Sequence, residues 1–135
     1  MKVTRYNLAD NDRKRKREVS LWHEGRAFDL WSLVHFLGGG VLAAAYFLLG
    51  FPFLSSFIAS FVLLFLWELF EILKGIKESV GNIVMDMFMG AIGFYAIWYL
   101  MDANLGDNIL LFLMVLGIFI ALNIRGFVAY TKRAK

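Results

Sequence analysis

The chain has 135 residues, of which 60% are hydrophobic and 19% are charged, and its formal net charge is +3. This apolar share, with a mean hydropathy of +0.65, is far above that of a soluble globular domain and fits one membrane-embedded domain. The chain has no cysteine, which excludes disulfides and thiolate chemistry.

The chain begins with a polar segment that precedes the first apolar run. Residues 1–19 form a basic arm that contains the sequence RKRKR at 13–17. Residues 20–31 mix tryptophan and leucine with charged side chains, a pattern that predicts an amphipathic helix lying in the membrane interface. A basic cluster beside membrane helices favours anionic lipid headgroups as its partner. We expect no nucleic-acid partner, because the rest of the chain offers no groove-reading element.

Four apolar segments follow, each close to the roughly 20 residues needed to cross about 30 Å of hydrocarbon. They cover residues 32–49, 53–73, 80–101 and 108–124. A turn at 50–52 separates the first two, because its proline cannot continue a helix cleanly. The sequence therefore predicts an all-α fold, an antiparallel bundle of four membrane-spanning helices over residues 32–125, followed by a basic tail at 126–135.

The charges in the loops predict the orientation of these helices. The loop at 50–52 has no charged residue, and the loop after the third segment carries only Asp102 and Asp107. The lysines and arginines all fall on the opposite side, which should be cytoplasmic. We therefore expect a multi-pass protein of the cytoplasmic (inner) membrane with both termini in the cytoplasm.

Glycine-rich stretches within two of the segments identify candidate helix contacts. Gly38, Gly39 and Gly40 lie in the first segment, and Gly90 and Gly93 lie in the third. Small residues let helix backbones approach in lipid, where no hydrophobic effect drives helices together. We therefore expect close helix packing at both stretches.

Six side chains able to bind metal lie in or beside the apolar segments, near the predicted cytoplasmic face. They are His35, Glu68, Glu71, Glu78, Asn82 and Asp86. The three-residue and four-residue steps among them place neighbouring members on shared helix faces. An ionisable side chain inside a membrane helix costs roughly 3 kcal/mol on insertion scales, so it indicates a functional site by default.

The donor types predict a divalent metal ion. Carboxylates packed together repel one another unless a cation lies between them. Oxygen ligands with one imidazole suit magnesium, manganese, iron or zinc. His35 and Glu71 are candidate general bases, and Ser32 is a candidate nucleophile for which a helix N-cap is the stronger reading. Candidate substrate contacts are Asp29, Lys74 and Lys77.

Three segments between residues 29 and 94 carry a family resemblance. They contain His35, Phe36 and Gly39; Trp67, Glu68 and Glu71; and Asn82, Asp86, Gly90 and Gly93. Together these motifs resemble the VanZ-like families and related uncharacterised families of small polytopic membrane proteins. The resemblance implies a shared site on the first three spans and assigns no reaction to it.

Three functions are compatible with the sequence. The first is a metal-dependent intramembrane hydrolase or transferase acting on a lipid or lipid-linked phosphate, with Asp86 and Glu68 as the main ligands. The second is a module that binds or transports protons or cations, since carboxylates in membranes commonly relay protons. The third is a structural subunit of a homo-oligomer or a larger membrane complex. The polar residues are confined to one leaflet, which argues against a full permeation path and favours the enzyme.

Overall fold

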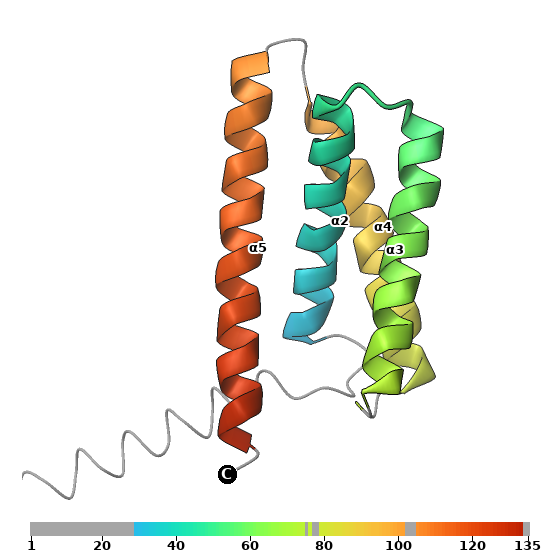
Figure 1. Cartoon of the computed structure of the whole chain (residues 1–135), viewed down its shortest axis with the longest axis vertical. Helices are drawn as coiled ribbons and strands as arrows, with labels where there is room; N and C mark the ends of the chain where they lie inside the picture. The colour runs from blue at the N-terminus through green and yellow to red at the C-terminus, as the bar shows by residue number, and fades with distance from the viewer. Residues whose placement is uncertain (1–28, 75, 77–78, 102–104, 134–135) are drawn as a thin grey trace, which may run out of the picture.

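The computed structural model describes residues 29–74, 76, 79–101 and 105–133, and the elements in these ranges are four α-helices (Figure 1). They are α2 (Leu30–Leu48), α3 (Phe53–Leu73), α4 (Val80–Leu100) and α5 (Leu105–Arg133). Each contains a segment long and apolar enough to cross a membrane, which in α5 is Gly106–Ala129. Within these ranges the chain is all-helical, as predicted, and its helices fit a multi-pass membrane protein.

Three helix ends differ from the predicted segments by more than one residue, and one of these is the start of α5, at Leu105 and not at residue 108. Helix α2 begins at Leu30, so Leu30 and Trp31 belong to the first spanning helix and not to an interfacial helix at 20–31. Helix α5 continues to Arg133, past the predicted end at residue 124, and takes in most of the predicted tail. The predicted basic arm and the rest of the interfacial helix fall on residues 1–28, which lie outside the described residues.

A capping box explains the early start of α2. The Oδ1 atom of Asp29 accepts hydrogen bonds from the backbone N–H groups of Trp31 and Ser32, at 2.8 and 3.3 Å. The Ser32 hydroxyl accepts in turn from the N–H of Asp29, at 3.4 Å. These bonds satisfy N–H groups that have no partner within the helix. The N-cap is therefore Asp29, and the expectation that Ser32 fills this position is wrong.

A glycine turn ends α2 and holds it close to α3. Gly50 has φ +74°, a left-handed conformation that favours glycine. Its N–H donates to the carbonyl of Phe47 at 2.9 Å, and the N–H of Phe51 donates to the carbonyl of Tyr46 at 3.0 Å. The Tyr46 and Phe51 rings also meet edge to face, with centroids 5.8 Å apart. Pro52 is the N-cap of α3, so only residues 49–52 connect the two helices.

Helix α2 is the centre of the arrangement, because it packs against each of the other three helices. Figure 1 shows α3 on one side of α2, α5 on the other, and α4 behind. The approach is closest between α2 and α4: a Cβ atom on Gly39 would clash with the carbonyl oxygen of Gly90, and one on Gly93 would clash with that of Phe36. The close helix packing predicted at the glycine stretches is therefore confirmed.

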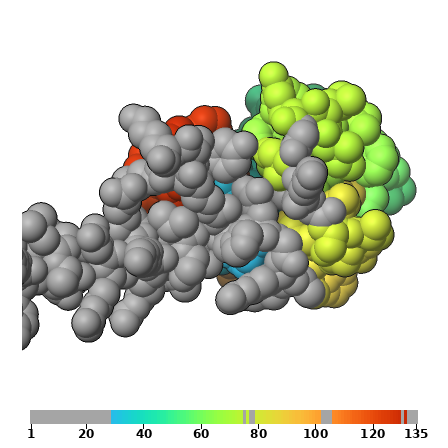
Figure 2. Space-filling view, turned by 90° about the horizontal axis from the view of Figure 1, so that it is seen from below, coloured from blue at the N-terminus to red at the C-terminus, as the bar shows by residue number. Residues whose placement is uncertain are grey.

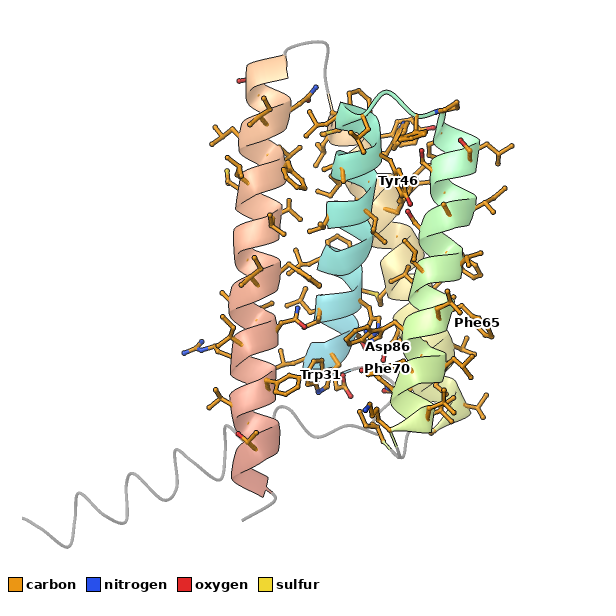
Figure 3. The ribbon with its side chains drawn as sticks, viewed as in Figure 1. Trp31, Tyr46, Phe65, Phe70 and Asp86 are labelled. Atoms are coloured by element: carbon orange, nitrogen blue, oxygen red, sulfur yellow. The ribbon has the colours of Figure 1, made fainter. Side chains whose placement is uncertain are left out.

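The interior of the bundle is apolar towards one end and polar towards the other. Towards the upper end it is an apolar core that contains Ala43, Ala44, Phe94, Ile97 and Val115. Figure 3 shows Tyr46 near this end and Asp86 towards the lower end, where polar side chains are buried instead. The outer surface is apolar. Phe65, for example, is 55% exposed and points away from the bundle (Figure 3), as suits a side chain that contacts lipid.

Candidate metal centre

Polar side chains from α2, α3 and α4 meet inside the lower end of the bundle. The buried members are Ser32, His35, Glu68, Asn82 and Asp86. Ser32 and His35 lie in the first turns of α2, whereas Glu68 lies near the end of α3. The two α4 residues lie in the first half of that helix. The polar groups therefore face one another and not lipid, as the cost of a charge in hydrocarbon requires.

His35 joins α2 to α3 through its ring nitrogens. Its Nδ1 atom lies 3.0 Å from the carbonyl oxygen of Trp31, and because a carbonyl can only accept, Nδ1 is the donor. Its Nε2 atom lies 2.9 Å from Oε1 of Glu68. Oε2 of Glu68 meets no donor among the described residues. Nε2 and the Glu68 carboxylate are thus the groups left with capacity to bind something further.

Glu71 completes a group of three potential metal ligands. One ligand atom each from His35, Glu68 and Glu71 lie within 4.8 Å of one another. The indole N–H of Trp67 donates to Oε1 of Glu71 at 2.9 Å and so orients this carboxylate. One imidazole and two carboxylates form a donor set that zinc, iron and manganese accept. The residues present therefore fit a divalent ion.

Asp86 lies in a second group of hydrogen bonds, which borders the first at His35. Its Oδ1 accepts from the hydroxyl of Ser32 at 2.5 Å, and its Oδ2 accepts from the side-chain amide of Asn82 at 2.8 Å. Oδ2 also lies 3.8 Å from Nδ1 of His35, whereas Glu68 contacts the other ring nitrogen. Of the six predicted ligands, the structure therefore brings together His35, Glu68 and Glu71. Asp86 and Asn82 are not part of this ligand group and bond to each other. Glu78 lies outside the described residues.

The remaining predicted site residues have other roles or positions. Ser32 is fully buried with its hydroxyl committed to Asp86, so it is not placed to act as a nucleophile on a lipid substrate. Asp29 caps α2. Lys74 is exposed at the end of α3, with its Nζ atom 5.3 Å from the centroid of the Phe70 ring. Lys77 lies outside the described residues.

Two neighbouring cavities lie beside the metal-ligand group, between α3 and α5. One has a volume of about 230 Å³ and is bordered by His35, and the other has about 320 Å³ and is bordered by Glu71. Trp31, Trp67 and Asn123 line both cavities, which are therefore adjacent. Figure 2, a view from the lower end, shows α5 on one side of the molecule and α3 and α4 on the other.

Sequence reasoning assigned no role at this site to three residues, although Trp67 belongs to one of the motifs that carry the family resemblance. Trp67 orients Glu71, and the four-residue spacing of the two was a readable signal. The carbonyl of Trp31, which is also four residues away, accepts a hydrogen bond from the His35 ring. Asn123, on α5, lines the cavities beside a site that had been assigned to the first three spans. Its contribution depends on how α5 packs, which the local sequence does not indicate.

Comparison with known proteins gives no match to a family model, a curated protein or a solved structure. The resemblance of residues 29–94 to the VanZ-like families therefore stays a prediction. The geometry of the site is the basis for a proposal about function.

Proposed function

We propose that this protein is a membrane enzyme that uses a divalent metal ion held by His35, Glu68 and Glu71. The proposal rests on the burial and the contacts of the Glu68 carboxylate. Its side chain is 2% exposed, its Oε1 lies 2.9 Å from Nε2 of His35, and its Oε2 meets no donor among the described residues. Burying a carboxylate with one oxygen that meets no donor is costly, and a cation placed among the three side chains would offset this cost.

The hydrogen bonds around the three ligands support a metal site over a chance cluster. A metal-binding histidine usually donates its second ring N–H to a carbonyl or carboxylate. Nδ1 of His35 has such a partner in the carbonyl of Trp31, and Glu71 is oriented by Trp67. The mixed nitrogen and oxygen donors suit zinc, manganese or iron, and the carboxylates also accept magnesium. Asp86 would act as a positioning residue, because both its oxygens are engaged by neighbours.

The reaction we propose is hydrolysis or transfer at a lipid-linked phosphate. A divalent ion would polarise a phosphoryl oxygen and favour attack by water. In hydrolysis, the water oxygen would bond to phosphorus while the ester P–O bond breaks. One proton of the water would pass to the departing alcohol and the other would stay on the released phosphate. The position of the cavities between α3 and α5, beside His35 and Glu71, supports a substrate that arrives from within the membrane.

We further propose an antiparallel arrangement in the inner membrane, with the site in the cytoplasmic leaflet. Lys74 follows α3 and Arg125 lies late in α5, both towards the end of the bundle that holds the site, whereas Asp107 lies in the first turn of α5. Basic residues mark the cytoplasmic side of membrane helices. This orientation would put the site at the depth of the anionic headgroups on that side.

A proton or cation relay has weaker support. Ser56 and Ser60 are buried on the same face of α3 as Glu68, at four-residue steps. Leu64, which is 7% exposed, occupies the position between Ser60 and Glu68 on this face. Along α3, the described residues therefore provide no continuous polar path from the site to the upper end. This favours a site that acts within one leaflet.

Elemental analysis of the detergent-purified protein tests the proposal. The wild type should hold a stoichiometric divalent ion after incubation with zinc, manganese or magnesium, and the Glu68→Gln variant should not. The control is Asp107→Asn, which removes an exposed carboxylate from the first turn of α5 and should keep the ion. Release of inorganic phosphate from phosphatidic acid in mixed micelles should require the same ion. A wild type that binds none of these ions would reject the enzyme and favour a structural subunit.

A further inference from the structure

The two cavities beside the metal-ligand group form one groove of graded polarity. We call it the α3–α5 groove, and Trp31, Trp67 and Asn123, which line both cavities, mark its middle. Above these residues its walls are apolar apart from His35, with side chains such as Leu63 and Phe119. Below them its walls combine the charged side chains of Glu71 and Lys74 with the apolar side chains of Phe70, Ile76 and Phe127. The groove therefore has an apolar end inside the bundle and a charged end where α3 stops.

We propose that the α3–α5 groove binds a single membrane lipid whose headgroup is a phosphate, with one hydrocarbon chain in the apolar end and the phosphate at Lys74. This inference rests on the proposed function, since it names the substrate class of the same metal site. The lipid would lie along α2 with its phosphate next to the ligand group. His35 and Glu71 border the groove, so the phosphate would be within reach of an ion held there.

The apolar end is suited to a hydrocarbon chain for a physical reason. The helices that form it are each long and apolar enough to span a membrane, so an apolar groove between them would be filled by hydrocarbon from the surrounding lipid. Gly38 forms part of its wall, and a Cβ atom at that position would lie 3.3 Å from Cε2 of Phe119 on α5. The missing side chain thus keeps space between α2 and α5 that a larger residue would take.

The charged end is suited to an anionic headgroup. Lys74 supplies a positive charge on a side chain that is exposed and already bends over the ring of Phe70, another residue of the lower cavity. The Nδ2 atom of Asn123 donates one N–H to the carbonyl of Phe119, which leaves its second N–H as a donor for a phosphate oxygen. A phosphate between Lys74 and a bound metal ion would meet positive charge on both sides. A neutral or zwitterionic headgroup would gain less from this arrangement.

Tryptophan quenching by brominated lipids tests the inference. A protein that carries Trp22→Phe and Trp98→Phe keeps Trp31 and Trp67, which both line the groove. It is reconstituted in phosphatidylcholine vesicles that contain chain-brominated phosphatidic acid, or phosphatidylcholine with the same brominated chains at the same mole fraction. We expect stronger, saturable quenching by phosphatidic acid. Lys74→Gln should reduce this preference about fivefold, the effect expected of one basic residue near an anionic lipid.

A matched pair of glycine variants separates the groove from the general lipid surface. Gly38→Leu should fill the apolar end and weaken quenching by both lipids. Gly117→Leu should leave quenching unchanged, because an added Cβ atom there meets open space. Circular dichroism confirms that each variant is folded. Should Gly38→Leu prove unfolded, the exposed Lys74→Gln exchange still decides the question.

The outcomes distinguish this inference from the proposed enzyme. Metal content is measured on the same samples, with and without EDTA. A preference for phosphatidic acid that depends on Lys74 supports the groove, even in a protein that binds no metal and is therefore not the proposed enzyme. Equal quenching by the two lipids in a metal-bearing protein overturns the groove and leaves the metal site standing.

Discussion

Nε2 of His35 lies 2.9 Å from Oε1 of Glu68, and this contact joins the beginning of α2 to the end of α3. The other ring nitrogen of His35 is committed to the carbonyl of Trp31. Nε2 and the carboxylate therefore have each other and little else among the described residues. A cation bound at this point would satisfy both groups, so its effects should be measurable on stability as well as on activity.

Metal binding should stabilise the folded protein. A ligand that binds the folded state and not the unfolded state adds about 2.7 kcal/mol when its concentration is 100 times its dissociation constant. We therefore expect the thermal unfolding temperature in detergent to rise on titration with zinc or manganese and to fall with EDTA. His35→Ala should abolish this response, whereas Tyr95→Phe, on an exposed ring near the opposite end of the bundle, should retain it. An equal response in His35→Ala would place the ion elsewhere.

The indole of Trp67 should tune metal affinity through Glu71. Its N–H donates to the Glu71 carboxylate at 2.9 Å, and residues that orient metal ligands typically contribute 10–100-fold in affinity. The Trp67→Phe exchange removes this donor and keeps an aromatic ring. It should raise the dissociation constant of the metal by about that factor, as measured by isothermal titration. Trp98→Phe serves as the control, because Trp98 packs in an aromatic cluster with Phe47 and Phe94. Equal affinities for both variants would mean that the Trp67 indole does not orient Glu71 for the metal.

The contacts of Asp86 predict a structural cost that is separate from metal binding. Asp86→Ala leaves the Ser32 hydroxyl and the Asn82 amide buried without this acceptor, and each abandoned buried donor costs about 1–3 kcal/mol. Unfolding in detergent, followed by circular dichroism, should show the variant destabilised. In the double variant with Ser32→Ala, part of the loss should be recovered, because one abandoned donor is gone. Strictly additive losses would show that the Ser32–Asp86 bond contributes nothing.

Local patterns in the sequence were enough to predict the helices. Apolar segment length and the proline at position 52 gave the bounds of α3 at both ends. The start of α2 was missed by two residues because the Asp29–Ser32 capping box was not read from the sequence. The end of α5 was missed because its polar last turns continue the helix beyond the apolar segment. Hydropathy alone does not indicate such a continuation.

The sequence indicated that a polar site exists more readily than it indicated which residues are the ligands. Spacing correctly indicated that polar side chains of three spans would be buried together at one end. Spacing could not indicate which carboxylate oxygens already accept hydrogen bonds from neighbouring side chains. Asp86 was expected to be a main ligand, but Ser32 and Asn82 occupy its two oxygens, whereas Glu68 keeps an oxygen without a donor. That difference depends on the register of α2 against α4, which contacts between distant residues determine.

The close packing of α2 on α4 should make one glycine far less tolerant of substitution than another. A Cβ atom on Gly93 would clash with the backbone carbonyl of Phe36, which has no rotamer by which to move away. Gly93→Ala should therefore lower the free energy of unfolding by at least about 2 kcal/mol, as overpacking of a tight interior does. Gly117→Ala adds the same atom in open space. It should instead raise the free energy of unfolding by about 0.5–1 kcal/mol, because alanine loses less backbone entropy than glycine when a helix forms. Detergent unfolding of the two variants side by side measures the difference. Equal stabilities would mean that α2 and α4 are farther apart than this packing places them, and the position of His35 relative to Asp86 would have to change with it.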